Sequence, residues 1–158
     1  MLGALTLAAQ ADCKVILDAE DKTLNTASHQ YVTGTTGDTT VNAELIYAAG
    51  NIYMKINGKW ISSGTTKEIE ELGQKNRQNP KATKPTCGYL KDELVKGEMA
   101  AVYISNEEAP TGKVSTQIWI SKTNGLPLRQ DVDVDLGAGK AKTHNSTRFE
   151  YGNIKPPV

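Results

Sequence analysis

The spacing of apolar and polar residues predicts a chain built mainly from β-strands, with two or three helices. The stretch 13–25 repeats apolar residues with the period of a helix, which places Val15, Ile16 and Ala19 on one face. A second helical stretch begins near Thr66, a capping residue followed by acidic and then basic side chains. A third, short helix is expected over 89–95.

Elsewhere, alternation with a period of two predicts about seven or eight strands. Asn57-Gly58 is a strong hairpin signal, because both central residues of a type I′ turn need a positive φ. Short hairpin links make neighbouring strands antiparallel. We therefore expect an α+β fold, a strongly curved antiparallel sheet covered by two or three helices. The strands are expected at about 29–36, 41–47, 52–56, 59–62, 99–104, 114–120, 128–136 and 143–151.

The amino-terminal segment has the pattern of an export signal. Residues 1–11 carry no charge, are rich in Leu and Ala, and end in Ala9-Gln10-Ala11, the small-x-small pattern at which a signal peptidase cuts. The basic residues that usually open such a signal are missing, so we interpret 1–11 as a signal-peptide remnant and 12–158 as one domain. The alternative is a short Ala-rich helix or tail. The segment is too short to span a bilayer, which takes about 20 apolar residues.

Cys13 and Cys87 are the only cysteines in the chain. Two cysteines in an exported protein favour one disulfide, which we predict here. Unpaired thiols and a metal-binding pair are the alternatives. The metal pair is disfavoured because there is no CxxC motif and only His29 and His144 are available as further ligands.

The charge balance argues against electrostatic partners. Lys+Arg and Asp+Glu both number 18, and no basic stripe suits nucleic acid or an anionic membrane. Asp131, Asp133 and Asp135 alternate with valines, and the Gly and Glu that a calcium loop needs at its sixth and twelfth positions are absent. We interpret them as one solvated strand face. No cofactor motif is recognised, and no metal site is expected.

No catalytic residues can be assigned. His29 and His144 lie in separate expected strands, and the chain has no Gly-x-Ser-x-Gly motif. Four aromatic residues stand out instead, because the chain is only 6% aromatic. Each can be explained as core or lid packing, but as a set they are our candidates for lining an apolar ligand pocket. They are Tyr53, Trp60, Tyr103 and Trp119.

Two stretches of sequence resemble the LolA-like superfamily of periplasmic, lipoprotein-carrier-like proteins. The first runs from Glu44-Leu45-Ile46 through Asn51-Ile52-Tyr53-Met54-Lys55 to Gly58-Lys59-Trp60. The second joins Ile118-Trp119-Ile120-Ser121-Lys122 to Gly125-Leu126-Pro127-Leu128-Arg129-Gln130, a strand, a Gly-Leu-Pro turn and a return strand. The resemblance implies an unclosed β-barrel with a helical lid, and an apolar concave cavity for acyl chains or other hydrophobic ligands.

Three functions follow as hypotheses. The first is a non-enzymatic periplasmic carrier or binding protein for a hydrophobic small molecule or lipoprotein acyl chain, without a transmembrane span. The second is an envelope protein-interaction or structural module that binds no small molecule. The third is a hydrolase, which would require His29 or His144 to lie beside a serine and a carboxylate in a cleft.

Overall fold

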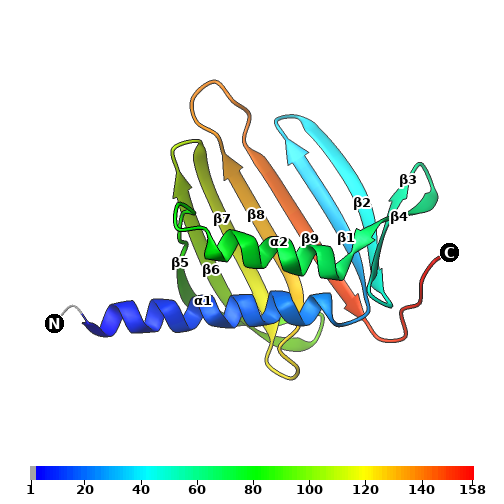
Figure 1. The fold of residues 1–158 in the computed structure, drawn as a ribbon, viewed down its shortest axis with the longest axis horizontal. Helices are drawn as coiled ribbons and strands as arrows, with labels where there is room; N and C mark the ends of the chain where they lie inside the picture. Colours follow the sequence, from blue (N-terminus) through cyan, green and yellow to red (C-terminus); the bar gives the residue numbers. More distant parts are fainter. Residues whose placement is uncertain (1–2) are drawn as a thin grey trace.

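The computed structural model describes residues 3–158, and the side chains of residues 10–158. Within this range nine strands form one antiparallel sheet in the order β4-β3-β2-β1-β9-β8-β7-β6-β5, and helices α1 and α2 cross its concave face (Figure 1). The edge strands β4 and β5 do not pair with each other, so the barrel stays half open. The predicted α+β class and curved sheet are confirmed. The elements are α1 Gly3–Leu24, β1 Ser28–Thr36, β2 Thr39–Ala48, β3 Asn51–Ile56, β4 Lys59–Thr65, α2 Thr66–Gln78, β5 Thr86–Val95, β6 Glu98–Ala109, β7 Gly112–Ser121, β8 Pro127–Asp135 and β9 Thr143–Tyr151.

Helix α1 packs on the sheet through the apolar face that the sequence predicts. Ile16 and Ala19 are buried against Ile118 and Ile120 of β7. Removing an isoleucine side chain from water contributes roughly 1.5–3 kcal/mol, so this seam holds α1 in place. The helix begins at Gly3, earlier than expected, and so includes most of the segment interpreted as a signal remnant. Met1 and Leu2 lie outside the described residues, and cleavage after Ala11 stays a prediction.

A disulfide and two hydrogen bonds fasten α1 further. Cys13 is joined to Cys87 of the edge strand β5, with 5.1 Å between their Cα atoms, as predicted. Nearby, the backbone N–H of Tyr89 donates to the Asp12 carboxylate at 3.2 Å. At the other end of the helix, the Lys22 ammonium donates to the carbonyl oxygen of Asn124. Helix α1 is therefore fixed to the sheet from Asp12 to Lys22.

The expected helix over 89–95 is wrong. These residues belong to β5, which pairs along its length with β6. The turn between the two strands explains why: Lys96 and Gly97 both have positive φ, 50° and 83°, which closes the chain directly into a hairpin. The described residues therefore contain nine strands and two helices.

Local irregularities bend the sheet. The register shifts at Ile52/Tyr53, at Tyr89/Lys91 and at Trp119/Ile120. Bulges of this kind increase the local twist and bend the strand that carries them. The Asn57-Gly58 hairpin has positive φ at both residues, 51° and 77°, as its sequence predicts.

Candidate functional site

Helix α2 lies over the concave face of the sheet with little of its surface in contact with the protein. None of its side chains, all of which are described, is buried, and Ile69 and Leu72 are 45% and 56% exposed. Its first turn is well formed: the Thr65 hydroxyl caps the N–H of Glu68, and the Glu68 carboxylate accepts from the N–H of Thr65 at 2.8 Å. The helix is thus anchored where it begins and lightly held over the rest of its length.

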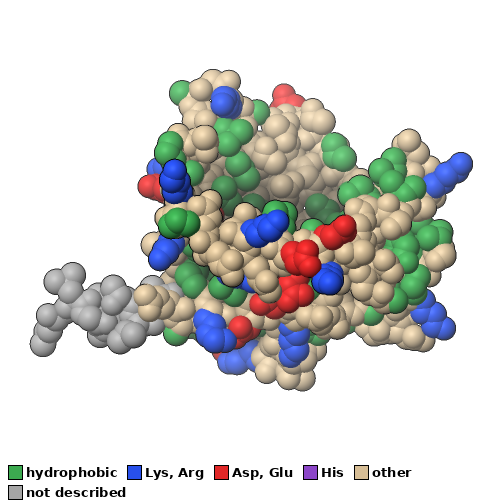
Figure 2. Space-filling view, in the orientation of Figure 1, with side chains coloured by type: hydrophobic (Ala, Val, Ile, Leu, Met, Phe, Trp, Pro, Cys, Tyr) green, Lys and Arg blue, Asp and Glu red, His purple; other side chains and the backbone are tan. Residues whose placement is uncertain are grey.

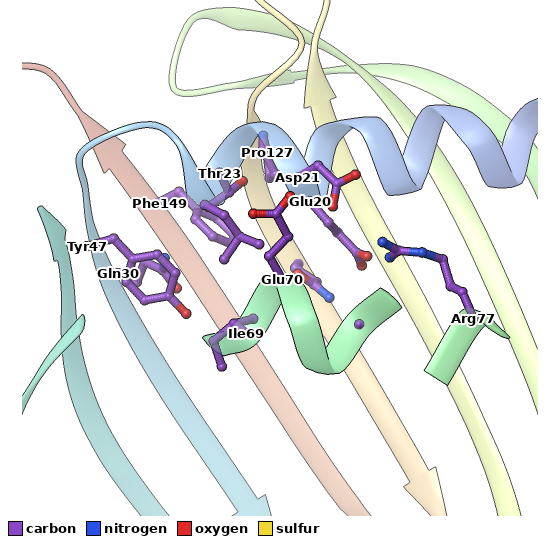
Figure 3. A pocket seen from close by; sticks show the side chains of 13 residues that line it. Glu20, Asp21, Thr23, Gln30, Tyr47, Ile69, Glu70, Arg77, Pro127 and Phe149 are labelled. Carbon is purple, nitrogen blue, oxygen red and sulfur yellow. The ribbon is translucent and has the colours of Figure 1, made fainter. Parts of the chain in front are cut away.

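A cavity of about 280 Å³ lies between α2, the second half of α1 and the sheet (Figure 3). Its apolar wall includes Ile69 of α2, Tyr47 of β2 and Phe149 of β9. Gly73 faces the cavity from α2, where the lack of a side chain leaves the space open. The full lining comprises Glu20, Asp21, Thr23, Leu24, Gln30, Tyr47, Ile69, Glu70, Gly73, Arg77, Pro127, Gln130 and Phe149.

Beyond α2 the concave face continues as an open apolar surface. Alternate residues of a strand share a face, so Leu45 lies on the face of Tyr47, and Val132 and Val134 lie on the face of Gln130. These three apolar side chains are only half-buried, because no helix covers them. The space-filling view shows this surface as a hollow above α2 that contains hydrophobic side chains (Figure 2).

Charged residues from both helices form the mouth of the cavity. Glu20 and Asp21 of α1 lie opposite Glu70 and Arg77 of α2, and the Arg77 guanidinium points toward the Glu20 carboxylate (Figure 3). Loss of hydration raises the pKa of Glu20, the neighbouring Asp21 raises it further, and Arg77 lowers it. The seam between the helices therefore carries three carboxyl groups and one guanidinium.

The structure does not bring the four predicted aromatic residues together. Tyr53 and Trp60 pack with Ile46 and Ala48, and Trp119 packs with Ala100 and Val102. Strand register puts these three aromatic residues on the convex face. Tyr103 lies on the helix side but packs near α1, beside Tyr89. None of the four lines the cavity under α2, and their role in ligand binding stays a prediction.

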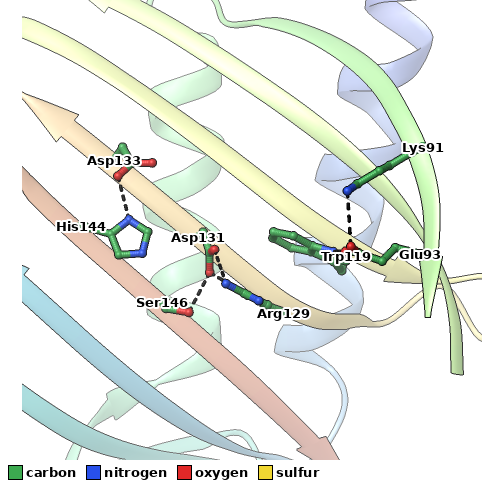
Figure 4. A network of polar contacts seen from close by, with 8 residues as sticks. All are labelled: Lys91, Glu93, Trp119, Arg129, Asp131, Asp133, His144 and Ser146. Carbon is green, nitrogen blue, oxygen red and sulfur yellow. Dashed lines mark hydrogen bonds and ion pairs between the residues drawn. The ribbon is translucent and has the colours of Figure 1, made fainter. Parts of the chain in front are cut away.

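Polar side chains pair across the convex face of the sheet (Figure 4). His144 Nδ1 lies 2.7 Å from Asp133, whereas the Ser146 hydroxyl donates to Asp131 at 2.7 Å. His29 lies 3.0 Å from Glu44. Each histidine thus has its own carboxylate. The three aspartates of β8 form strand-face pairs, with Asp135 held by Lys142.

The sequence alone does not identify the residues that line the cavity, and the reason is specific. Tyr47 and Phe149 stand in strands of mixed character, and the sequence does not say which strand face meets the helices. Gly73 did give a signal, because glycine inside a helix costs about 1 kcal/mol relative to alanine and so calls for a structural reason.

Comparison with known proteins identifies the fold. No protein-family model and no curated protein matches the sequence. Among solved structures, MucB in complex with MucA(peri) matches with a TM-score of 0.53 at 10% identity, over 92% of this chain and 57% of that one. LprF from Mycobacterium bovis matches with a TM-score of 0.47 at 13% identity, over 96% of both chains. A DUF1329 family protein from Desulfovibrio piger gives 0.37 at 9%, over 96% and 94%.

The MucB match shows a shared fold, and this chain spans little more than half of that protein. The unclosed sheet with a helical cover is also the architecture that the resemblance to the LolA-like superfamily implies. The chain therefore shares its half-open sheet fold with MucB, and this fold agrees with the one that the resemblance to the LolA-like superfamily implies. Among the described helices, none is both long enough and apolar enough to cross a membrane.

Proposed function

We propose that the protein is a non-enzymatic carrier or binding protein for a hydrophobic ligand, which it holds on the concave face beneath α2. The observation that carries this proposal is an amphipathic helix that lies over an apolar sheet face without burying its own apolar residues. A tightly packed helix would bury Ile69 and Leu72, because each buried side chain contributes roughly 1.5–3 kcal/mol. An apolar ligand between helix and sheet would supply the missing contacts.

The shape of the site supports an elongated ligand. The cavity of about 280 Å³ is small beside typical ligand sites of roughly 300–1,000 Å³. Beside it on the same face of the sheet, however, lie the apolar side chains of Leu45, Val132 and Val134. An acyl chain can occupy both parts if α2 moves slightly outward. The ligand class we propose is therefore a lipid or a lipoprotein acyl chain.

We place this activity in the periplasm. Two features support export: the Ala9-Gln10-Ala11 pattern at the amino end, and the disulfide between Cys13 and Cys87. Disulfides persist in oxidising compartments such as the bacterial periplasm and are rare in the cytosol.

Native mass spectrometry of protein purified from the periplasm tests the proposal. We expect a fraction of molecules to carry one bound lipid, and added fatty acid to displace a fluorescent fatty-acid probe. Protein that carries no lipid and takes up no probe would overturn the proposal. The same preparation also tests the interaction hypothesis, because a protein partner would appear as a defined mass.

A protein-interaction role is the second candidate, and the edge strand β5 favours it. This strand has no partner on its outer side in the described sheet, and Leu90 and Leu94 are 46% and 63% exposed. An unpaired edge with apolar side chains can accept a strand from another chain. Capture of one defined envelope protein, lost when Leu90 and Leu94 are changed to lysine, would support this role over lipid binding.

A further inference from the structure

Two arginines lie directly opposite each other on the convex face of the sheet. Arg129 of β8 and Arg148 of β9 are register partners, and they form the last pair of that ladder. Like charges at directly opposed positions of antiparallel strands destabilise the pair, because their Cβ atoms are about 5 Å apart. Each guanidinium is paired with a neighbouring carboxylate, Asp131 or Glu150, and a bound anion would offset the repulsion that remains.

Aromatic rings and carboxylates hold both guanidinium groups in place. Arg129 lies 4.7 Å from the ring centroid of Trp119 and donates to Asp131 from Nε at 3.0 Å (Figure 4). Arg148 lies 4.1 Å from the ring centroid of Tyr31 and donates to Glu150. A guanidinium group has five N–H donors. Most of the N–H donors of Arg129 and Arg148 have no acceptor among the described side chains.

The two arginines border a groove of about 700 Å³, well within the range of ligand sites. Lys96 adds a third positive charge. Glu98 is the one carboxylate among the described lining residues, and it accepts a hydrogen bond from the Ser121 hydroxyl. Val95 and Leu128 supply apolar side chains to the wall, whereas the side chains of Phe149 and Tyr151 lie on the concave face by strand register. The lining consists of Val95, Lys96, Glu98, Asn124, Leu128, Arg129, Ser146, Arg148, Phe149 and Tyr151.

We propose that this groove binds a single anionic amphiphile. Its phosphate or carboxylate headgroup contacts Arg129 and Arg148, and its apolar part lies against Val95 and Leu128. Guanidinium groups suit this role, because their planar fork matches the oxygens of phosphate and carboxylate groups. The two arginines lie on the opposite face of the sheet from the cavity under α2, although Phe149 borders both spaces, and the proposal does not rest on ligand binding in that cavity.

The occupant we expect is one molecule rather than a bilayer surface. Asp131 and Glu150 stand on the same face as the arginines, and these carboxylates would repel a broad anionic surface. A single headgroup can reach the free donors of both guanidiniums without approaching the carboxylates as closely. The turns that carry Lys96 and Asn124 enclose the groove at one end.

Hexyl phosphate, a short amphiphile that stays monomeric, tests the proposal in a low-salt titration followed by NMR. We expect it to bind at least about tenfold more tightly than inorganic phosphate, because each buried methylene contributes about 0.8 kcal/mol. R129Q and R148Q should each weaken binding by about tenfold, through loss of a charge-assisted hydrogen bond. K113Q removes one positive charge distant from the groove and serves as the matched control.

Several results would overturn the proposal. These are no binding by the wild type, equal affinity for inorganic and hexyl phosphate, equal binding by wild type and R148Q, or binding only to phosphatidylglycerol vesicles. R148K keeps the charge but loses the planar fork, so it should bind more weakly than wild type, and it replaces R148Q if that variant fails to fold. G73L, which fills the cavity under α2, should bind hexyl phosphate normally and so separates this site from the lipid site.

Discussion

Cys13 in α1 and Cys87 in β5 are joined by a disulfide although 74 positions separate them in the sequence. Closing so long a loop restricts the unfolded chain. Replacing both cysteines by serine is therefore expected to lower the free energy of unfolding by about 4 kcal/mol. Chemical denaturation measures the change. The double variant should no longer respond to reductant, and a wild-type midpoint that reductant leaves unchanged would contradict the prediction.

Gly73 allows the proposed lipid site to be blocked without loss of stability. It lies within α2 and lines the cavity, and a Cβ added there would contact only the flexible end of Arg77, at 3.4 Å. We expect G73L to occupy the cavity and weaken fatty-acid binding at least about tenfold, while better helix propensity contributes about 1 kcal/mol. Probe displacement and thermal denaturation measure both effects. G73A is the control, since it has the helix preference but fills little space.

The capping hydroxyl of Thr65 should control the local stability of α2. Thr65→Ala removes the oxygen that accepts from the N–H of Glu68, at a cost of about 1 kcal/mol. Since α2 buries no side chain, the helix should open locally while the sheet remains folded. Hydrogen exchange should speed up in α2 and stay unchanged in β7. Thr65→Ser keeps the oxygen and should behave as wild type, and unchanged exchange in the alanine variant would refute the role.

We expect Glu20, which stays exposed at the helical seam, to make the stability of this seam depend on pH. Its pKa is raised in the folded protein, chiefly by loss of hydration. The folded state therefore binds the proton more tightly than the unfolded state does, and this stabilisation is lost as pH rises from the ordinary carboxyl range through the raised pKa. Glu20→Gln removes the titration. The unfolding free energy of E20Q relative to that of the wild type should therefore increase as pH rises. A difference that stays constant with pH would contradict the prediction.

Most of the fold follows from local sequence. A hairpin turn such as Asn57-Gly58 can be recognised directly from its two residues. The buried face of α1 follows from the helical period of its apolar residues. The strand β5 does not follow in the same way, because residues 89–95 also suit a helix. Their state is decided by pairing with β6, a contact between strands that alternation alone does not reveal.

The site was harder to predict because strands such as β7 carry apolar residues on both faces. Ile118 and Ile120 face α1, which places Trp119 on the convex side between them. Leu128 shows the effect of a bulge: alternation assigns it to the face of Gln130, but the register shift at Trp119/Ile120 lets it pack with the Trp119 cluster. Aromatic content was therefore a poor guide to the cavity.

The pairing of β1 with β9 has a consequence for how the chain folds. Each half of the sheet is a meander of sequential hairpins, and within the sheet the two halves are joined by the β1–β9 ladder, which runs from Ser28 opposite Tyr151 to Thr36 opposite Thr143. Contacts between such distant residues form late, because they require closure of a very long loop. We expect the halves to assemble first and the central seam to close last, once the whole chain is available. Until then the inner edges of β1 and β9 remain unpaired and open to aggregation.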